Sequence, residues 1–229
     1  MVIGNGLIAK AFKDFEQNEA YLFFCSGVSN STCRDVAEFD REKDLLNQNI
    51  REHGKKTFIY FSTCSIEDPS LSESMYTRHK LDIEATIASS CKSYYIFRLS
   101  NVVGRTPNSF TVLNFLFNAI KGGQKFDLWE NSNRNLIDVE DAAAIVRKVL
   151  QLKLPANAII NVANAHSYDV VDIVKEIERF LGKEGHYQLV DKGVKFSISV
   201  SDIRAIIDEL QIDFGDEYLT GLLEKYYTK

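Results

Sequence analysis

Val2-Ile-Gly-Asn-Gly-Leu-Ile-Ala9 joins the end of a short apolar strand to the beginning of a helix. Apolar residues recur at helical spacing from Leu7 to Phe15. Gly4 and Gly6 match the pattern G-x-G-x-x-(G/A), in which glycines allow a tight turn and let a pyrophosphate approach the helix N-terminus. Glycine also occurs at strand–helix turns for purely structural reasons. These residues alone therefore support the two interpretations about equally.

Strand and helix patterns alternate along the following chain. Further strands are expected at Tyr21–Cys25, Thr57–Ser62, Tyr94–Leu99 and Ile159–Val162, and helices at Arg34–His53 (Val36 inward), Met75–Ser89, Ser109–Lys121 and Asp138–Leu152. Because the strands are apolar on both faces, we expect a parallel sheet covered by helices on both sides. Beyond residue 163 the sequence predicts a helix capped by Ser167 and ending at Leu181, short strands near 187–190 and 195–200, and two final helices.

The composition is that of an ordinary globular protein. The 229 residues include 27 basic and 32 acidic ones, for a net charge of −5, and 45% are hydrophobic, which excludes disordered and collagen-like classes. The mild acidity argues against nucleic acid or a membrane surface as partner. With no signal peptide or spanning segment visible, a cytoplasmic location is expected. The four cysteines lack zinc-ligand spacing, so we expect reduced thiols and no metal site.

Tyr76 and Lys80 lie four residues apart and so share one face of a predicted helix. A tyrosine acts as general acid or base near neutral pH only if its pKa of ~10 is lowered, and a cation one turn away lowers it. The preceding strand ends Ser62-Thr-Cys-Ser65, where a hydroxyl can share the proton and hold a carbonyl oxygen. Such a Tyr–Lys pair is common by chance on a surface helix, but the hydroxyl-bearing strand end favours catalysis. His79, between the two, is expected to face away.

With these residues the chain resembles the extended short-chain dehydrogenase/reductase superfamily, specifically its NAD-dependent epimerase/dehydratase, nucleotide-sugar-modifying branch. Arg98-Leu-Ser-Asn101-Val-Val-Gly104 is similar to the family's R-x-x-N-x-x-G segment, whose Asn meets the sugar nucleotide. Arg134-Asn-Leu-Ile-Asp138-Val-Glu-Asp141 is similar to its R-x-x-(I/V)-x-V-x-D segment, whose Arg binds the diphosphate. Read without the family, Arg98 is a strand-end charge, and Asp138 and Asp141 favour a helix N-terminus.

The resemblance implies an NAD or NADP cofactor, a nucleotide-diphosphate sugar as substrate and a complete set of site residues. The implied catalytic residues are Thr63, Tyr76 and Lys80, and the substrate-binding residues are Asn101 and Arg134. The implied cofactor-binding residues are Gly4, Asn5, Gly6, Leu7, Ile8, Cys25, Ser26, Gly27, Tyr76 and Lys80. Lys80 would lower the pKa of Tyr76 and hold the nicotinamide ribose. A homodimer is also implied, formed through the helices at 34–53 and 75–89.

The chain departs from the family in its first half. The strand ending near Phe24 is similar to the family's fourth strand, yet it lies only about twenty residues after Gly6. Since one βαβ unit needs ~30 residues or more, roughly two β–α units are missing. The acid expected ~20 residues past the glycines falls near Ser26, where there is none. We therefore expect no adenine pocket or ribose acid, and weakened cofactor binding.

Two further positions bear on the reaction. Family dehydratases have an Asp-Glu pair after the catalytic Thr, and this chain has Cys64 and Ser65, which argues against 4,6-dehydration. Cys64 is expected to be a buried or spectator thiol. The favoured function is keto reduction or C4-type epimerisation of a nucleotide sugar with an NAD(P) cofactor. The alternative is a non-catalytic or cofactor-free nucleotide-sugar-binding protein that has lost the adenine-binding half.

The predicted fold class is α/β. A Rossmann-like parallel sheet with helices on both faces and a reduced number of strands is expected over residues 1–163. Residues 124–134 are expected to contribute to the substrate side. A small C-terminal substrate-binding subdomain is expected over residues 164–229 and should lie over the carboxyl ends of the strands, where α/β ligands bind.

Overall fold

The computed structural model describes residues 1–228 and centres on a five-stranded sheet in the order β1-β2-β3-β4-β9. These strands are β1 (Val2–Ile3), β2 (Tyr21–Phe24), β3 (Thr57–Thr63), β4 (Tyr94–Leu99) and β9 (Ala158–Val162). Every pairing between them is parallel. The predicted α/β class and the reduced parallel sheet are therefore confirmed.

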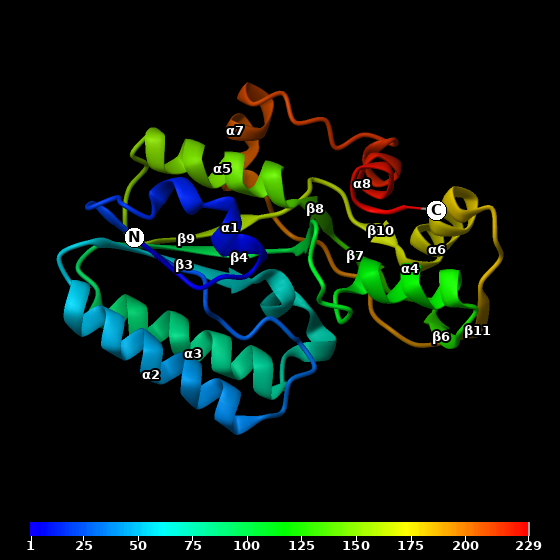
Figure 1. Cartoon of the computed structure of the whole chain (residues 1–229), viewed down its shortest axis with the longest axis horizontal. Helices are drawn as coiled ribbons and strands as arrows, with labels where there is room; N and C mark the ends of the chain where they lie inside the picture. The colour runs from blue at the N-terminus through cyan, green and yellow to red at the C-terminus, as the bar shows by residue number, and fades with distance from the viewer. Residues whose placement is uncertain (229) are drawn as a thin grey trace.

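Helices cover both faces of this sheet (Figure 1). One face carries α1 (Leu7–Ala11), the short helix η1 (Lys13–Phe15), α5 (Val139–Gln151) and α7 (Arg204–Glu209), and the other carries α2 (Val36–His53) and α3 (Met75–Ser90). Successive strand residues alternate between the two cores: Phe23 and Ile59 pack in the first, and Phe24 and Tyr60 in the second. Burial on both faces explains why the strands are continuously apolar.

The connection from β1 to β2 differs from the next two connections, β2 to β3 and β3 to β4. All three steps run in the same direction along the sheet, but α1 crosses on the face opposite to α2 and α3. The connections on the two faces therefore have opposite hands, although one hand is strongly preferred in proteins. β1 is also an edge strand, and the strand order never reverses. This topology agrees with the loss of β–α units that the sequence predicts after Gly6.

A second, smaller core lies beside the sheet (Figure 1). It is enclosed by α4 (Val112–Gly122), α6 (Val170–Leu181), α8 (Tyr218–Tyr226) and the paired strands β6 (Lys125–Trp129) and β11 (His186–Val190). Two further strand pairs connect it to the sheet: β5 (Asn101–Val103) with β8 (Leu136–Asp138), and β7 (Asn133–Arg134) with β10 (Tyr168–Asp169). Three short helices complete the fold: η2 (Cys64–Glu67), η3 (Pro69–Leu71) and η4 (Ser201–Ile203).

Three local predictions are wrong. The N-cap residue of α6 is Asp169, so Ser167 does not cap that helix. No strand forms at 195–200 within the described chain, because the side-chain amide of Asn133 bonds both the N–H and the carbonyl oxygen of Phe196. Val36 is 56% exposed because it stands at the very start of α2.

The C-terminal residues divide between the two cores. Ile203, Ile206 and Phe214 pack in the main core, and Leu219 and Leu223 pack in the smaller one. The domain boundary at residue 163 stays a prediction. None of the described helices is both long and apolar enough to cross a membrane.

Candidate active site

The turn between β1 and α1 is tightly packed at Gly4 and open at Gly6. Gly4 has a φ of +120°, and a Cβ there would lie 2.7 Å from the backbone oxygen of Cys25. Gly4 is therefore required for a structural reason. A Cβ at Gly6 would meet nothing within 4 Å, so this glycine leaves the outer face of the turn open.

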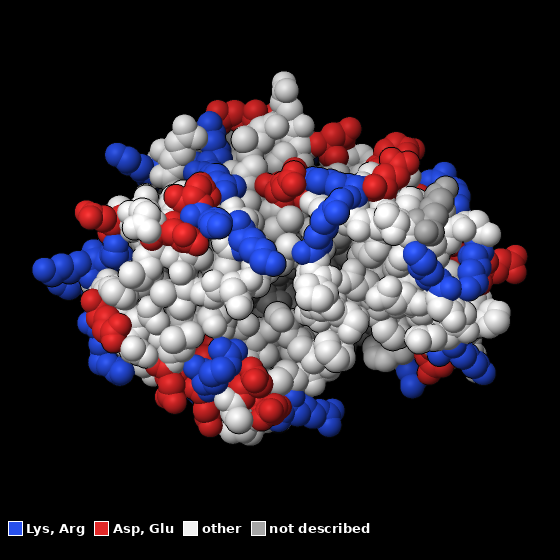
Figure 2. All heavy atoms as spheres, in the orientation of Figure 1, with Lys and Arg blue, Asp and Glu red and all other residues white. Residues whose placement is uncertain are grey.

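A cavity of about 480 Å³ lies at the carboxyl ends of the parallel strands, where α/β folds bind ligands. Among the predicted site residues, its wall contains Leu7, Ile8, Cys25, Gly27, Thr63, Tyr76, Lys80, Asn101 and Arg134. Gly4, Asn5, Gly6 and Ser26 do not line it. Figure 2 shows a hollow between the two parts of the molecule, with Lys and Arg side chains along one rim. The fold thus gathers residues from position 7 to position 134 around one cleft.

Tyr76 and Thr63 meet in this cleft. β3 ends at Thr63, and Ser74 caps α3 by accepting the N–H of Thr77 at 3.0 Å, which places Tyr76 in the first turn. The Thr63 hydroxyl lies beside the Tyr76 phenol and acts on its pKa. Burial raises the pKa of Tyr76, with a smaller lowering by Thr63 and a further raising by Glu42. Tyr76 is therefore a neutral phenol that can donate a proton.

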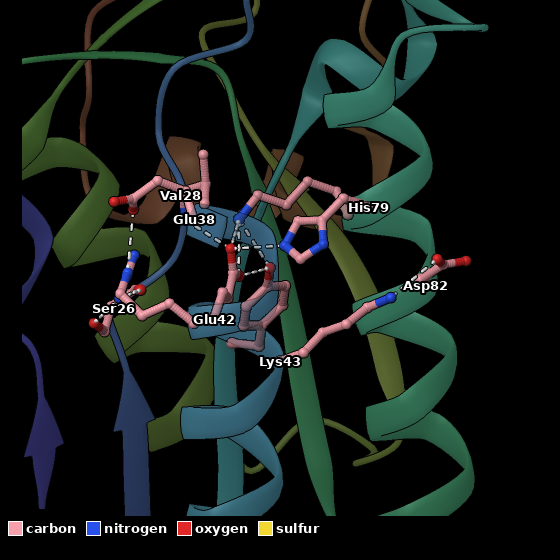
Figure 3. Close-up of polar contacts among 10 residues, drawn as sticks. Ser26, Val28, Glu38, Glu42, Lys43, His79 and Asp82 are labelled. Atoms are coloured by element: carbon pink, nitrogen blue, oxygen red, sulfur yellow. Dashed lines mark hydrogen bonds and ion pairs between the residues drawn. The ribbon is translucent and has the colours of Figure 1, made fainter. Parts of the chain in front are cut away.

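Lys80 is held by the buried carboxylate of Glu42, which Figure 3 labels. Its Nζ donates to Oε1 and Oε2 of Glu42 at 3.0 and 3.2 Å, and to the hydroxyl of Tyr60 at 2.9 Å. The Lys80 and Glu42 side chains are 2% and 0% exposed. Burial lowers the pKa of Lys80, and Glu42 acts in the opposite direction. The charge of Lys80 is thus compensated inside the protein.

Glu42 has further partners from three elements. It accepts the N–H of Val28 at 2.7 Å and the Tyr60 hydroxyl at 2.6 Å, and it contacts Nε2 of His79 at 3.0 Å. Burial alone would raise the pKa of Glu42, but the contacts with His79, Lys80, Tyr60 and Val28 outweigh it and bring the pKa to about 2. Glu42 is therefore an ionised carboxylate at neutral pH.

Glu42 was not among the predicted site residues, and its contacts overturn two expectations. Lys80 does not lower the pKa of Tyr76, because burial dominates and Glu42 compensates the ammonium. His79 does not face away: it is 4% exposed and bonded to Glu42. A signal existed in the sequence, since Glu42 lies at helical spacing between Phe39 and Leu46 on the buried face of α2. A carboxylate on such a face needs a buried cationic or hydrogen-bonding partner.

Arg134 and Asn101 reach the cleft from the strands beside the smaller core. Nη1 of Arg134 donates to the backbone oxygen of Asn133 at 2.7 Å. Burial lowers the pKa of Arg134, and nearby Asp68 raises it. Asn101, at the start of β5, donates to the backbone oxygen of Asn135 at 2.9 Å. Their substrate-binding roles remain predictions.

Other polar residues from the motifs have structural partners. Arg98 forms a two-point ion pair with Glu84 at 3.0 and 2.6 Å. Asp138 caps α5 and accepts a hydrogen bond from Lys225 at 2.7 Å. Cys64 is buried with its Sγ 3.1 Å from the backbone oxygen of Arg98, and burial raises its pKa. These contacts favour the structural interpretation for Arg98 and Asp138, and that of a spectator thiol for Cys64.

Ser62 and Ser100 have buried hydroxyl oxygens with no hydrogen-bond partner among the described residues. Both residues line the cleft, Ser62 in β3 and Ser100 directly after β4. A buried polar atom without a partner is costly, so these hydroxyls indicate that a polar ligand or water completes the site.

A dinucleotide fits this cleft in part. The unpartnered hydroxyls of Ser62 and Ser100 and the Thr63–Tyr76 pair suit its polar, nicotinamide-bearing end. Lys80 does not fit as a ribose ligand, because its ammonium already makes three hydrogen bonds. Since β1 is an edge strand, no strand of the described chain lies beyond it to form an adenosine pocket.

Comparisons with known proteins agree with this architecture. The sequence profile of the NAD dependent epimerase/dehydratase family matches residues 43–163. No curated protein matches the chain. The solved structure of dTDP-glucose 4,6-dehydratase from Bacillus anthracis, in complex with NAD, is 14% identical with a TM-score of 0.71, over 97% of this chain and 77% of that one.

Two solved epimerases are also similar. UDP-glucuronic acid 4-epimerase from Bacillus cereus, in complex with UDP-glucuronic acid and NAD, is 16% identical with a TM-score of 0.72, over 94% of this chain and 76% of that one. UDP-glucose 4-epimerase from Thermus thermophilus, in complex with NAD, is 15% identical with a TM-score of 0.66, over 88% and 77%. At these identities the likeness to solved structures shows the fold.

Proposed function

Because the chain belongs to the NAD dependent epimerase/dehydratase family, we propose that it reduces a keto group of a nucleotide-activated sugar. NADH or NADPH would supply the hydride when bound. Tyr76 would donate a proton to the sugar oxygen, and Thr63 would hydrogen-bond both that oxygen and the phenol. Asn101 and Arg134 would hold the nucleotide-sugar.

One observation carries this proposal: a neutral, buried phenol stands in a ligand-sized cleft, beside a hydroxyl from the neighbouring strand end. Keto reduction needs a proton donor beside the carbonyl, and Tyr76 is in the protonated state for that task. Epimerisation through a keto intermediate also needs the same group to accept a proton in the oxidation half. Epimerisation begins with the oxidation half and so needs an ionised phenol at the outset, whereas reduction begins from the protonated phenol found here, so we favour reduction.

The substrate class follows from charge and from the relatives. Arg134 lies half-buried in the cleft wall of a protein with a net charge of −5, which suits a diphosphate. The solved relative from Bacillus cereus was determined with UDP-glucuronic acid. We infer that a nucleoside-diphosphate sugar occupies the part of the cleft between Arg134 and Tyr76.

The test is calorimetric titration with NADH, NADPH and a panel of nucleoside-diphosphate sugars and keto-sugars, followed by a turnover assay on those that bind. Tyr76→Phe should lower turnover by about 100-fold or more with little effect on binding. Arg134→Ala should weaken nucleotide-sugar binding by about 30-fold or more. Lys125→Ala, which removes an exposed cation from β6, is the control and should change neither quantity. Unchanged turnover in Tyr76→Phe would contradict the mechanism.

A second candidate function is binding of a nucleotide-sugar without cofactor or catalysis. The occupied ammonium of Lys80 and the edge position of β1 favour it, since both remove contacts to a dinucleotide. The same titration separates the two functions. Binding of nucleotide-sugars with no binding of NADH or NADPH would replace the reductase with the binding protein.

A further inference from the structure

The ammonium of Lys80 has no N–H left for a ligand. An ammonium has three donors, and Nζ bonds Glu42 Oε1 at 3.0 Å, Glu42 Oε2 at 3.2 Å and the Tyr60 hydroxyl at 2.9 Å. Lys80 nevertheless belongs to the cleft wall, beside Gly27. A Cβ at Gly27 would lie 2.8 Å from Nζ and 2.9 Å from Glu42 Oε1. The backbone therefore passes so close to the Lys80–Glu42 pair that this position has room only for glycine.

Glu42 is anchored independently of Lys80. The N–H of Val28, the hydroxyl of Tyr60 and the ring of His79 all contact its carboxylate, so the loop after β2, β3 and α3 converge on it. Figure 3 shows Glu42 pointing from α2 toward His79 on α3. The carboxylate is therefore a fixed acceptor, and the long Lys80 side chain is the partner that reaches it.

We propose that Glu42 is a positioning residue that holds Lys80 away from the ligand in the cleft, so that Thr63 is the side chain that assists Tyr76. This inference rests on the proposed function, because it concerns the cofactor and the proton donor of that site. The Lys80 Nζ lies 5.7 Å from the centroid of the Tyr76 ring. At that distance an uncompensated ammonium would favour ionisation of the phenol, and the paired one does not.

Other charged groups surround the pair and would remain after Glu42 is changed. Arg41 on α2 and Glu84 on α3 both act on Lys80, and His79 on α3 contacts Glu42. Glu42→Gln removes the compensating charge and one of the two acceptor oxygens. The amide keeps one acceptor oxygen, so at least one N–H of Lys80 becomes free to bind a ligand.

The experiment compares Glu42→Gln with Glu38→Gln, the same substitution on the exposed side of the same helix. NADH binding is measured by calorimetry at pH 6, where Lys80 is more fully protonated. Without ligand, the exchange of the Lys80 Nζ protons with water is followed by NMR of ¹⁵N-labelled lysine, with the resonance assigned by its absence in Lys80→Met. We expect Glu42→Gln to bind NADH about tenfold more tightly and to exchange the Nζ protons of Lys80 about tenfold faster, since a freed ammonium N–H offers one charge-assisted hydrogen bond. Glu38→Gln should match the wild type in both.

The inference is overturned if Glu42→Gln binds NADH no more tightly than Glu38→Gln, or if the Lys80 Nζ protons exchange at the same rate in both variants. If no protein binds NADH, the proposed function fails. The exchange of the Nζ protons, which needs no ligand, then still decides whether Glu42 restrains Lys80.

A milder variant covers the case in which Glu42→Gln does not fold. Tyr60→Phe removes one acceptor of Lys80 and leaves the charge pair intact. It should bind NADH about threefold more tightly. Tyr95→Phe is its control, because the Tyr95 hydroxyl bonds the backbone of Leu154 and Tyr95 does not line the cleft. Equal NADH affinity in Tyr60→Phe and Tyr95→Phe would contradict the inference.

Discussion

Charges near the cleft are mostly compensated by a neighbouring side chain. Glu42 pairs with Lys80, and Glu84 pairs with Arg98, so these two cations are neutralised before any ligand arrives. Tyr76 consequently lies beside a neutral pair and stays a phenol. A buried ion pair contributes little net stability, but removing one partner is costly because the other charge stays buried. The pair therefore makes stability depend on the ionisation of Glu42.

The protein should lose stability in acid because of Glu42. Its pKa of about 2 in the folded protein lies below the ordinary value of 4.5, so the unfolded chain binds this proton more tightly. The stabilisation is complete above pH 4.5 and is lost as the pH falls toward 2. We expect the free energy of unfolding, measured by chemical denaturation, to fall between pH 5.5 and pH 3. The fall should be smaller for Glu42→Gln than for the wild type, by about 1 kcal/mol or more. Glu38→Gln should keep the wild-type fall, and an equal fall in both variants would refute this role.

The element that sets the geometry of the cleft is the β1–α1 turn with the end of β2. Gly4 sits against the backbone of Cys25, and this contact keeps the two strand ends together at the cleft. Gly6 makes no such contact and opens toward solvent. Gly4 is therefore needed for the fold, whereas Gly6 leaves open space outside the turn.

Gly4→Ala should destabilise the protein by about 1–3 kcal/mol, because alanine at a φ of +120° is strained and its Cβ would lie 2.7 Å from a carbonyl oxygen. Gly6→Ala is the matched control and should cost less, at most about 1 kcal/mol, because its φ of −73° suits alanine and only the N-cap preference for glycine is lost. Thermal or urea unfolding of both variants measures the difference. Equal losses in the two would mean that the close approach at Gly4 does not constrain the fold.

In the whole molecule, the cleft is walled by the smaller core on one side and ends at the edge strand β1 on the other. Dinucleotides bind across two mononucleotide-binding halves, at the point where the strand order reverses. Here the order runs from β1 to β9 without a reversal, and the cleft wall includes Leu7 and Ile8 after β1 as well as Val112 and Phe115 of the smaller core's α4. The dimer expected through α2 and α3 stays a prediction, which light scattering of the purified protein can test.

We expect the adenosine part of a dinucleotide to add little affinity. Reduced nicotinamide mononucleotide and NADH should have dissociation constants within about tenfold of each other, because the second half of NADH meets no pocket on the described chain. ADP-ribose should not compete with NADH at comparable concentrations. Calorimetric competition measures all three ligands. NADH binding about 100-fold tighter than the mononucleotide would show that an adenosine site exists after all.

The sequence by itself determined the parallel sheet, the helix order and the family, because apolar periodicity, glycine turns and the Tyr76–Lys80 spacing are local patterns. The loss of β–α units could also be inferred from the sequence, because too few residues separate Gly6 from the strand that ends at Phe24. Only the tertiary structure decided the partner of Lys80. Glu42 is 38 residues away in sequence, on a different helix, and only packing of α2 against α3 brings the two charges together. That contact alone determines whether the ammonium is available to a ligand, because a buried charge binds the nearest fixed countercharge that the fold provides.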